Sequence, residues 1–222
     1  MVDAIARPTH HFGLRLSCGN FGDMTDEKTI EYYNQSAGVY VKCLSSQGTP
    51  DRHLQAFIDA VIPSGRVLDL GAGPGNSTKM MQDAGLKAEA WDASHAFVDM
   101  AIEAGVPARQ ALFSDLSVES AYDGIFANFS LLHAPREEMN DHLNRIAAAL
   151  TPGGVFHIGM KVGEAAERDR LGRFYTYYGV QELVDLVEAR GLGVFDRDTF
   201  QVRGMTDAME PAVILLARKP DA

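Results

Sequence analysis

One short segment of this 222-residue chain combines residue types that could bind a nucleotide. It spans residues 67–78, where an apolar run containing Asp69 is followed by alternate glycines, Gly71, Gly73 and Gly75. This pattern predicts a buried strand, a tight turn and the start of a helix. Glycine permits positive φ and lets a ligand approach the backbone without meeting a Cβ atom. A turn of this kind after the first strand of an α/β sheet is typical of nucleotide sites.

Asp69 indicates which kind of nucleotide this loop would bind. A dinucleotide loop has the spacing G-x-G-x-x-G and holds an anionic pyrophosphate on free backbone N–H groups. The glycines here follow the spacing G-x-G-x-G, and the carboxylate lies two residues before the first of them. A carboxylate at that position repels phosphate and suits a cationic ligand that carries an amino acid. The alternative is a glycine-rich turn between strand and helix that binds no ligand.

The segment resembles the first motif of the class I S-adenosylmethionine-dependent methyltransferases, D-x-G-x-G-x-G. Asp69, Gly71, Gly73 and Gly75 match its essential positions. From Ile30 to the C-terminus, the chain is similar to the small-molecule methyltransferases of the ubiquinone and menaquinone biosynthesis group. The resemblance implies S-adenosylmethionine as cofactor, S-adenosylhomocysteine as product and a small-molecule methyl acceptor.

A second acid follows the next predicted strand. This strand is expected over Ala88–Trp91, and Asp92 lies at its carboxyl end, where a carboxylate can accept hydrogen bonds from both ribose hydroxyls. The resemblance implies that Asp92 binds the ribose and that Ala72 and Ala93 lie beside the cofactor. The alternative role is capping the helix that starts near Ser94, and the two roles are compatible.

Two further loops carry residues that this family uses to bind the cofactor. In the family, an acid after the third strand bonds the adenine amino group, and the next backbone N–H meets a ring nitrogen. Asp115 and Leu116 match that pattern, although aspartate is also common in surface turns. The loop after the fourth strand lies beneath the sulfonium in the family, so Asn128 and Phe129 are expected to line the methionine end. That loop lacks the N/D-P-P-aromatic motif of enzymes that methylate nucleic-acid bases.

Tyrosines on the first predicted helix are candidates for closing the pocket. Tyr32, Tyr33 and Tyr40 lie on that helix, and in related enzymes such a helix folds over the cofactor. An aromatic face stabilises a nearby cation by roughly 0.5–2 kcal/mol, which suits a sulfonium. The alternative is that these rings pack in the core. Arg52 is a candidate for binding the methionine carboxylate.

His133 is the candidate general base. An imidazole titrates near neutrality and could take a proton from an acceptor hydroxyl, amine or thiol. The Leu-Leu-His pattern that contains His133 is also frequent in this group where no base is needed. A structural or cofactor-shielding role is therefore the alternative.

The acceptor side is expected between the fifth strand and the following helix. The candidate acceptor-binding residues are Lys161, Arg173, Tyr175, Tyr177 and Tyr178. An arginine with nearby tyrosines suits a carboxylated or aromatic acceptor. The alternative is that these aromatic rings only pack the next helix onto the sheet.

Alternating strand and helix patterns must position these residues. Two helices are expected first, one starting at Thr25 as N-cap and one over Pro50–Val61. The predicted strands are Arg66–Leu70, Ala88–Trp91, Arg109–Leu112, Gly124–Asn128, Val155–Met160, Val194–Val202 and Ala212–Arg218. The predicted helices among them are Asn76–Ala84, Ser94–Ala104, Pro135–Leu150 and Gln181–Ala189. The last two strands have no helix between them, so they must pair as an antiparallel hairpin around a turn near Gly204–Pro211.

These patterns predict an α/β fold with a Rossmann-like, doubly wound sheet and helices on both faces. The sheet is expected to have seven strands, mostly parallel with an antiparallel C-terminal hairpin, and the resemblance implies the order 3-2-1-4-5-7-6. We expect residues 1–24 to form a loose N-terminal leader and residues 25–222 to form a single methyltransferase domain. Within it, residues 25–62 would form a helical lid and residues 161–178 an acceptor-side insertion.

Composition argues against several other classes of protein. The apolar content of 46% and charged content of 23% are ordinary for a soluble globular protein. A net charge of −10 argues against a nonspecific nucleic-acid or membrane surface. Cys18 and Cys43 give no disulfide framework, no residues show the spacing of a metal site, and neither a signal peptide nor a membrane span is expected.

We therefore expect a cytoplasmic monomer or homodimer without a metal. Two alternatives to the active methyltransferase stay open at this point. One is a cofactor-binding but catalytically inactive regulatory or partner protein. The other is an NAD-dependent oxidoreductase, against which the glycine spacing and the closing hairpin count.

Overall fold

The computed structural model describes residues 26–44, 51–203 and 209–221, with no side chains described at 42–44. The predictions for the leader at 1–24, for Thr25 as a helix cap and for much of the turn near Gly204–Pro211 lie outside these residues. Among the described residues, no helix has the length and apolar character needed to cross a membrane.

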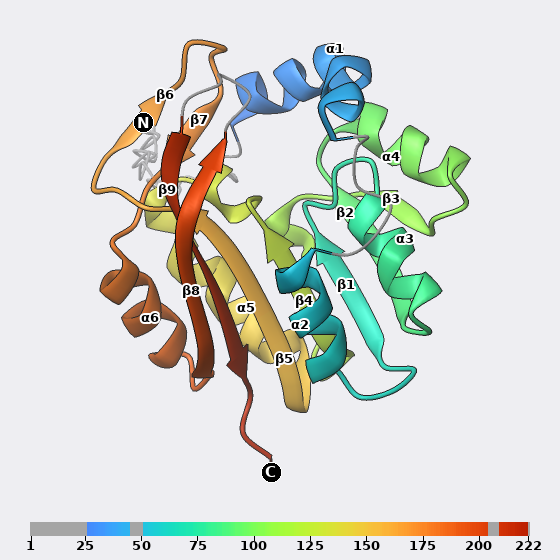
Figure 1. The fold of residues 1–222 in the computed structure, drawn as a ribbon, viewed down its shortest axis with the longest axis vertical. Helices are drawn as coiled ribbons and strands as arrows, with labels where there is room; N and C mark the ends of the chain where they lie inside the picture. The colour runs from blue at the N-terminus through green and yellow to red at the C-terminus, as the bar shows by residue number, and fades with distance from the viewer. Residues whose placement is uncertain (1–25, 45–50, 204–208, 222) are drawn as a thin grey trace, which may run out of the picture.

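A seven-stranded sheet forms the centre of the molecule, in the order β3-β2-β1-β4-β5-β9-β8 (Figure 1). Strands β1 to β5 run parallel, and β9 lies antiparallel between β5 and β8. The strands are β1 (Arg66–Leu70), β2 (Lys87–Asp92), β3 (Ala108–Gln110), β4 (Tyr122–Asn128), β5 (Leu150–Lys161), β8 (Gly193–Arg203) and β9 (Met209–Arg218). The predicted fold class is confirmed. When the seven strands of this sheet are numbered along the sequence, β8 and β9 are the sixth and seventh, and the predicted order 3-2-1-4-5-7-6 is also confirmed.

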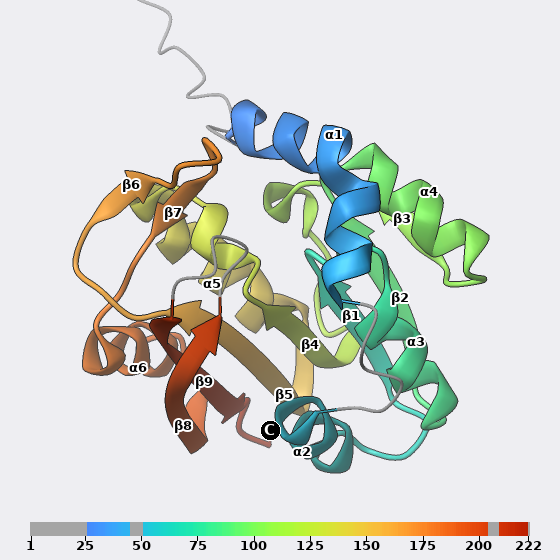
Figure 2. The same ribbon diagram turned by 45° about the horizontal axis from the view of Figure 1, so that its top comes forward.

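Helices cover both faces of the sheet (Figure 2). One face carries α2 (Arg52–Ala60), α3 (Asn76–Asp83) and α4 (His95–Glu103), and the other carries α5 (Met139–Ala149) and α6 (Val180–Glu188). Each face of the sheet has its own hydrophobic core. Side chains of β1 pack into both cores, because successive side chains of a strand point to opposite faces. Val67 packs with Phe57 of α2, whereas Leu68 and Leu70 pack with the α5 and α6 side.

Helix α1 (Glu27–Leu44) lies across the carboxyl end of the sheet and packs beside α4 (Figure 2). The Asp26 carboxylate accepts hydrogen bonds from the backbone N–H groups of Lys28 and Thr29, at 3.1 and 3.4 Å. It therefore acts as the N-terminal cap of α1. The Asn34 side chain bonds the Ser94 hydroxyl at 2.7 Å and fixes α1 against the start of α4.

Two local features differ from the sequence predictions. The predicted helix over Pro135–Leu150 begins as a 3₁₀ turn at Arg136–Glu138, and α5 itself starts at Met139. The acceptor-side segment contains an antiparallel hairpin of β6 (Ala166–Arg168) and β7 (Phe174–Thr176), which the sequence pattern did not predict.

Candidate functional site

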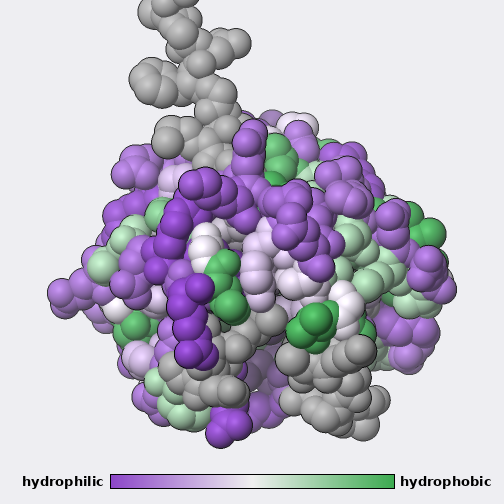
Figure 3. Space-filling model, turned by 90° about the horizontal axis from the view of Figure 1, so that it is seen from above, coloured by the Kyte–Doolittle hydropathy of each residue, from purple (hydrophilic) through white to green (hydrophobic). Residues whose placement is uncertain are grey.

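A cavity of about 220 Å³ lies at the carboxyl ends of β1, β2 and β4, and residues of α1 form part of its wall. The face of the molecule at this end is largely hydrophilic, with a few apolar side chains near its centre (Figure 3). The described lining residues are Asp26, Thr29, Ile30, Tyr33, Tyr40, Asp69, Gly71, Ala72, Gly73, Pro74, Asn76, Ser77, Asp92, Ala93, Ser94, Phe97, Ala111, Leu112, Phe113, Phe126, Asn128, Phe129, Ser130 and His133.

The three glycines of the first loop have different structural roles. All three have positive φ, but only Gly71 and Gly73 line the cavity. A Cβ atom at Gly71 would lie 2.3 Å from the Cβ of Ser130, and one at Gly75 would lie 3.0 Å from the Cβ of Ala101. At Gly73 a Cβ atom would approach only the Tyr40 ring, at 4.0 Å. Gly71 and Gly75 therefore allow close packing, whereas Gly73 leaves its backbone open toward the cavity.

Asp92 joins the glycine loop to the end of β2. One carboxylate oxygen accepts the Gly73 N–H at 2.7 Å, and the other accepts the Ser94 N–H at 2.8 Å. Burial raises the pKa of Asp92 to about 6, and these backbone hydrogen bonds oppose the rise. Each carboxylate oxygen has a further lone pair for a ligand hydroxyl, so the predicted ribose role fits this geometry. The helix cap is Ser94, which accepts the Phe97 N–H.

Asp69 lines the cavity but is deeply buried, with 2% of its surface exposed. Its carboxyl group accepts the Thr78 hydroxyl at 2.7 Å from the first turn of α3. Burial raises the pKa of Asp69 to about 7, and the nearby Asp92 charge adds to the rise. A cation in the cavity would therefore stabilise the ionised form of this carboxyl group.

The two residues predicted to contact adenine, Asp115 and Leu116, are not among the described lining residues of the cavity. Asp115 is exposed, and its carboxylate accepts the Leu112 N–H at 2.8 Å. The Leu116 N–H donates to the Phe113 carbonyl, and its side chain is buried in the core. Asp115 is the last residue of a 3₁₀ turn, Phe113–Asp115, and Leu116 follows it as the C-terminal cap. Leu112 and Phe113 line the cavity in their place, together with Ala111.

The end of β4 and the loop after it contribute two predicted residues, Asn128 and Phe129, to the cavity wall. Asn128 and Phe129 both line the cavity, and Phe129 has φ of 55°. The Asn128 side-chain oxygen accepts a hydrogen bond from His157 Nε2 at 3.1 Å, which orients the amide. Ser130, which sequence reasoning missed, donates its hydroxyl to the Leu70 carbonyl at 2.6 Å and ties this loop to β1.

Two of the three predicted tyrosines of α1 line the cavity, and the third is not among its described lining residues. Tyr33 and Tyr40 line the cavity, whereas Tyr32 is not among its described lining residues and contacts the edge of the Tyr33 ring. Arg52 lies on α2, is exposed, and forms an ion pair with Asp198 of β8. The structure therefore does not bring Tyr32 or Arg52 to the cavity.

His133 lines the cavity, but both of its ring nitrogens have partners within the protein. Nδ1 lies 2.6 Å from the Phe174 carbonyl oxygen, and Nε2 lies 2.9 Å from the Tyr33 hydroxyl. Burial, together with the positive charges of Arg173 and Lys161, lowers the pKa of His133 to about 4, although the hydrogen bond to Phe174 opposes this change. A neutral imidazole with an occupied lone pair is a poor general base, so the geometry favours the structural alternative for His133.

None of the five predicted acceptor residues is among the described lining residues of the cavity. Tyr175 and Tyr178 are buried in the larger core, beside Tyr177. Lys161 is 8% exposed and forms an ion pair with Glu210 at 2.5 Å. Arg173 is 3% exposed and bonded to Asp169. The packing alternative therefore fits Tyr175 and Tyr178, which lie in the core on the α5 and α6 side, whereas Tyr177 is only partly buried there.

Several lining residues gave no sequence signal of their own. Thr29 and Ile30 of α1 and Phe97 of α4 line the cavity because of how α1 packs, which local patterns do not specify. Pro74 and Ser77 could have been found, since they lie within or beside the glycine loop. Among the residues that the structure describes, no three His, Cys, Asp or Glu side chains are arranged to hold a metal ion.

Comparisons with known proteins identify the part of the chain that surrounds this cavity. Residues 67–154 match the family described as methyltransferase domain. A trans-aconitate 2-methyltransferase from Mycolicibacterium gilvum is 36% identical over 117 residues, which cover 52% of this chain and 45% of that protein. A cypemycin N-terminal methyltransferase from Streptomyces is 34% identical over 163 residues, covering 68% of this chain and 62% of that protein. The chain thus spans less than two thirds of the length of these curated relatives.

A solved structure resembles the fold over most of its length. It is the 1,6-didemethyltoxoflavin-N1-methyltransferase of Burkholderia thailandensis, with bound 1,6-didemethyltoxoflavin and S-adenosylhomocysteine. The TM-score is 0.70 at 22% identity, and the match covers 87% of this chain and 88% of that one. The likeness confirms the predicted fold.

Proposed function

We propose that this chain is a class I S-adenosylmethionine-dependent methyltransferase that transfers a methyl group to a small-molecule acceptor and releases S-adenosylhomocysteine. The observation that carries the proposal is the charge of the cavity wall. The acidic residues among its described lining residues are Asp26, Asp69 and Asp92, with no lysine or arginine among them. Such a wall opposes a pyrophosphate and suits a ligand with a positive sulfonium.

The residues present fit the adenosyl group. Asp92 can accept ribose hydroxyls, and the open backbone at Gly73 permits close approach of the ligand. Leu112 and Phe113 offer an apolar wall for adenine, and Asn128, at the end of β4, is the candidate for the methionine end. These assignments extend the family pattern to the residues that line this cavity.

The chemistry requires little covalent help from the protein. S-adenosylmethionine supplies a methyl group that is already activated for nucleophilic attack. The residues of this chain therefore contribute mainly by orienting the two reactants, since aligned groups reach large effective molarities. Helix α1 contributes Tyr33 and Tyr40 to the cavity wall.

Binding of S-adenosylhomocysteine compared with NAD tests the proposal most directly. A ligand that binds only the folded state stabilises it by about 2.7 kcal/mol at a hundredfold excess over its dissociation constant. We expect a clear rise in melting temperature with S-adenosylhomocysteine and none with NAD. Stabilisation by NAD alone would instead favour the oxidoreductase alternative.

An aspartate variant assigns that binding to this cavity. Asp92→Asn keeps the size of the side chain but removes its charge, and should weaken S-adenosylhomocysteine binding about tenfold, as expected for the loss of hydrogen bonds to a charged group. Asp83→Asn is the matched control, because Asp83 lies on α3 with its side chain 63% exposed and pairs only with Lys79 among the described residues. Equal weakening by both variants would contradict the assignment.

Transfer of a labelled methyl group separates an enzyme from an inactive binder. The relatives named above act on different acceptors, so their acceptors do not carry over to this chain. Label found in any small molecule of a metabolite panel supports an active enzyme. Binding of S-adenosylhomocysteine without transfer to any acceptor would favour the regulatory alternative. A cytoplasmic location and a monomeric or homodimeric state complete the proposal.

A further inference from the structure

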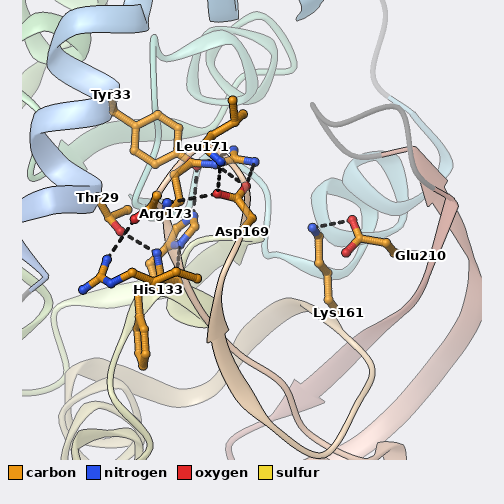
Figure 4. Close-up of polar contacts among 11 residues, drawn as sticks. Thr29, Tyr33, His133, Lys161, Asp169, Leu171, Arg173 and Glu210 are labelled. Atoms are coloured by element: carbon orange, nitrogen blue, oxygen red, sulfur yellow. Dashed lines mark hydrogen bonds and ion pairs between the residues drawn. The ribbon is translucent and has the colours of Figure 1, made fainter.

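A chain of hydrogen bonds links the β6–β7 hairpin to the cavity wall (Figure 4). The Asp169 carboxylate accepts from Arg173 Nε and Nη2, at 3.0 and 2.6 Å. Arg173 Nη1 donates to the Tyr33 hydroxyl oxygen at 3.2 Å, and that hydroxyl lies 2.9 Å from His133 Nε2. The chain ends where His133 Nδ1 meets the Phe174 carbonyl oxygen at 2.6 Å.

The groups at the two ends of this hydrogen-bonded series fix the direction of every hydrogen bond within it. A carbonyl oxygen can only accept, so His133 Nδ1 must carry the proton that lies between it and Phe174. In the neutral imidazole Nε2 is then an acceptor, and the Tyr33 hydroxyl must donate to it. A guanidinium can only donate, so Arg173 uses one lone pair of the same hydroxyl oxygen.

To a ligand in contact with it, the Tyr33 hydroxyl therefore offers only an acceptor. Its proton is held by His133, one lone pair is held by Arg173, and one lone pair is left over. Among the described residues, no further donor to this oxygen is recorded, and Tyr33 and His133 both line the cavity. The matching ligand group at this point of the wall is a hydrogen-bond donor.

This series of hydrogen-bonded groups contains none that could deprotonate the methyl acceptor before methyl transfer. Burial lowers the pKa of His133 to about 4, and burial raises the pKa of the Tyr33 hydroxyl against the opposing charge of Arg173. Both groups therefore stay neutral near pH 7. A nucleophile held here must carry a free lone pair while it still bears its hydrogen.

We propose that the methyl acceptor is a weakly basic nitrogen that carries hydrogen, as in an aromatic amine, and that its N–H donates to the Tyr33 oxygen. This inference rests on the proposed methyltransferase function. Tyr33 is then a specificity-determining residue, and His133 and Arg173 are positioning residues that fix the direction of its proton. The acceptor nitrogen keeps its lone pair for the methyl group because the N–H, and not the lone pair, meets Tyr33.

The transfer balances without a base from the protein. The nitrogen lone pair forms the new N–C bond, the C–S bond breaks, and its electron pair stays on sulfur. The arylammonium product is acidic enough to release its proton to water near neutral pH. A phenol, by contrast, would need to lose its proton first. A carboxylate would meet a wall that contains the acidic residues Asp26, Asp69 and Asp92 and no described lysine or arginine.

Ligand binding to the protein loaded with S-adenosylhomocysteine tests the donor directly. The probes are a ring-substituted aniline and its N,N-dimethyl analogue, which lacks the N–H. Wild type should bind the aniline about tenfold more tightly, as expected for one hydrogen bond and the unpaired acceptor left without it. Tyr33→Phe should abolish that preference. Tyr122→Phe is the matched control, because the Tyr122 hydroxyl bonds Glu89 at the far end of β4, and it should keep the preference.

Two further measurements use the wild-type protein and do not depend on a folded variant. Nitrogen-15 NMR of His133 should show a protonated Nδ1 and an unprotonated Nε2 at pH 7. Labelled methyl transfer should reach the aniline at least about tenfold faster than the matching phenol or benzoate, a ratio equal to about 1.4 kcal/mol.

The outcomes separate this inference from the proposed function. An equal affinity for the two probes, a preference that survives in Tyr33→Phe, a protonated His133 Nε2, or faster labelling of phenol or benzoate would each overturn the inference. The proposed function would survive all four results. Loss of S-adenosylhomocysteine binding in wild type would instead overturn the proposed function.

Discussion

Asp69 is a buried acid whose ionisation should govern how stability depends on pH. Burial raises the pKa of Asp69 to about 7, above its ordinary value of 3.8. Between these two pH values the folded state holds a proton that the unfolded state has released. This contribution to stability is therefore complete below about pH 4 and is lost as the pH rises through 7.

Asp69→Asn should consequently stabilise the ligand-free protein more at pH 8 than at pH 5. Each unit of pKa difference corresponds to about 1.4 kcal/mol, so we expect a gain of a few kcal/mol at most. Urea unfolding at both pH values measures it, with the exposed Asp99→Asn as control. A gain that is the same at both pH values would show that the cause is packing and not charge.

At the scale of single residues, the sequence predicted the positions whose role depends on the local motif. Asp69, Gly73, Asp92, Asn128 and Phe129 all line the cavity. Asp115 matched the family pattern but is used to cap the Leu112 N–H, because its turn folds back on itself. Motif spacing specifies the residue type, but the backbone of the turn decides where its side chain points.

The turn from β1 into α3 tolerates no side chain at its first glycine. Gly71 and Gly85 both have positive φ, at 78° and 91°, but differ in their surroundings. A Cβ atom at Gly85 meets nothing within 4 Å, whereas at Gly71 it meets the Cβ of Ser130 at 2.3 Å. The two positions therefore separate backbone strain from steric overlap.

Alanine substitution at each glycine should show this difference. Gly85→Ala should lower the free energy of unfolding by about 1–2 kcal/mol, the usual cost of the left-handed backbone. Gly71→Ala should cost roughly 1–3 kcal/mol more, because the loop after β4 must move. Denaturant unfolding measures both variants. Equal losses would mean that Ser130 moves freely.

Among the elements, periodicity predicted the main strands and helices but missed the β6–β7 hairpin. Its strands have three residues each, too short for an alternating pattern to emerge. Contacts distant in sequence stabilise it, such as the Thr29 hydroxyl oxygen that accepts the Phe174 N–H at 2.8 Å. Local sequence cannot encode a contact that depends on where α1 lies, so the sequence could not show that the predicted acceptor residues are absent from the described cavity lining.

For the whole molecule, two buried imidazoles predict sensitivity to acid. Burial lowers the pKa of His133 to about 4 and that of His157 to about 3. The unfolded chain binds these protons below about pH 6.5, before the folded protein does. Stability from these residues is thus complete above pH 6.5 and is lost as the pH falls toward 3.

His157→Gln should flatten this dependence. The His157 ring stacks on Phe126 with centroids 4.1 Å apart, so the variant should be less stable at pH 7.5. Its free energy of unfolding should nevertheless fall less steeply between pH 6.5 and pH 4 than that of wild type. Urea unfolding across this range measures the slopes, with the exposed His95→Gln as control. Parallel slopes for wild type and His157→Gln would contradict the buried neutral state.

The position of β9 also constrains the order in which the protein can be completed during synthesis. This strand is the last of the sheet to leave the ribosome, yet it lies inside the sheet and pairs with β5 from Val155 to Lys161. Until it emerges, the nascent chain leaves the apolar edge of β5 without its neighbour. The sheet can therefore close only after β9, which ends at Arg218, has emerged from the ribosome. Before that point, the nascent chain exposes the unpaired edge of β5 to chaperones and to aggregation.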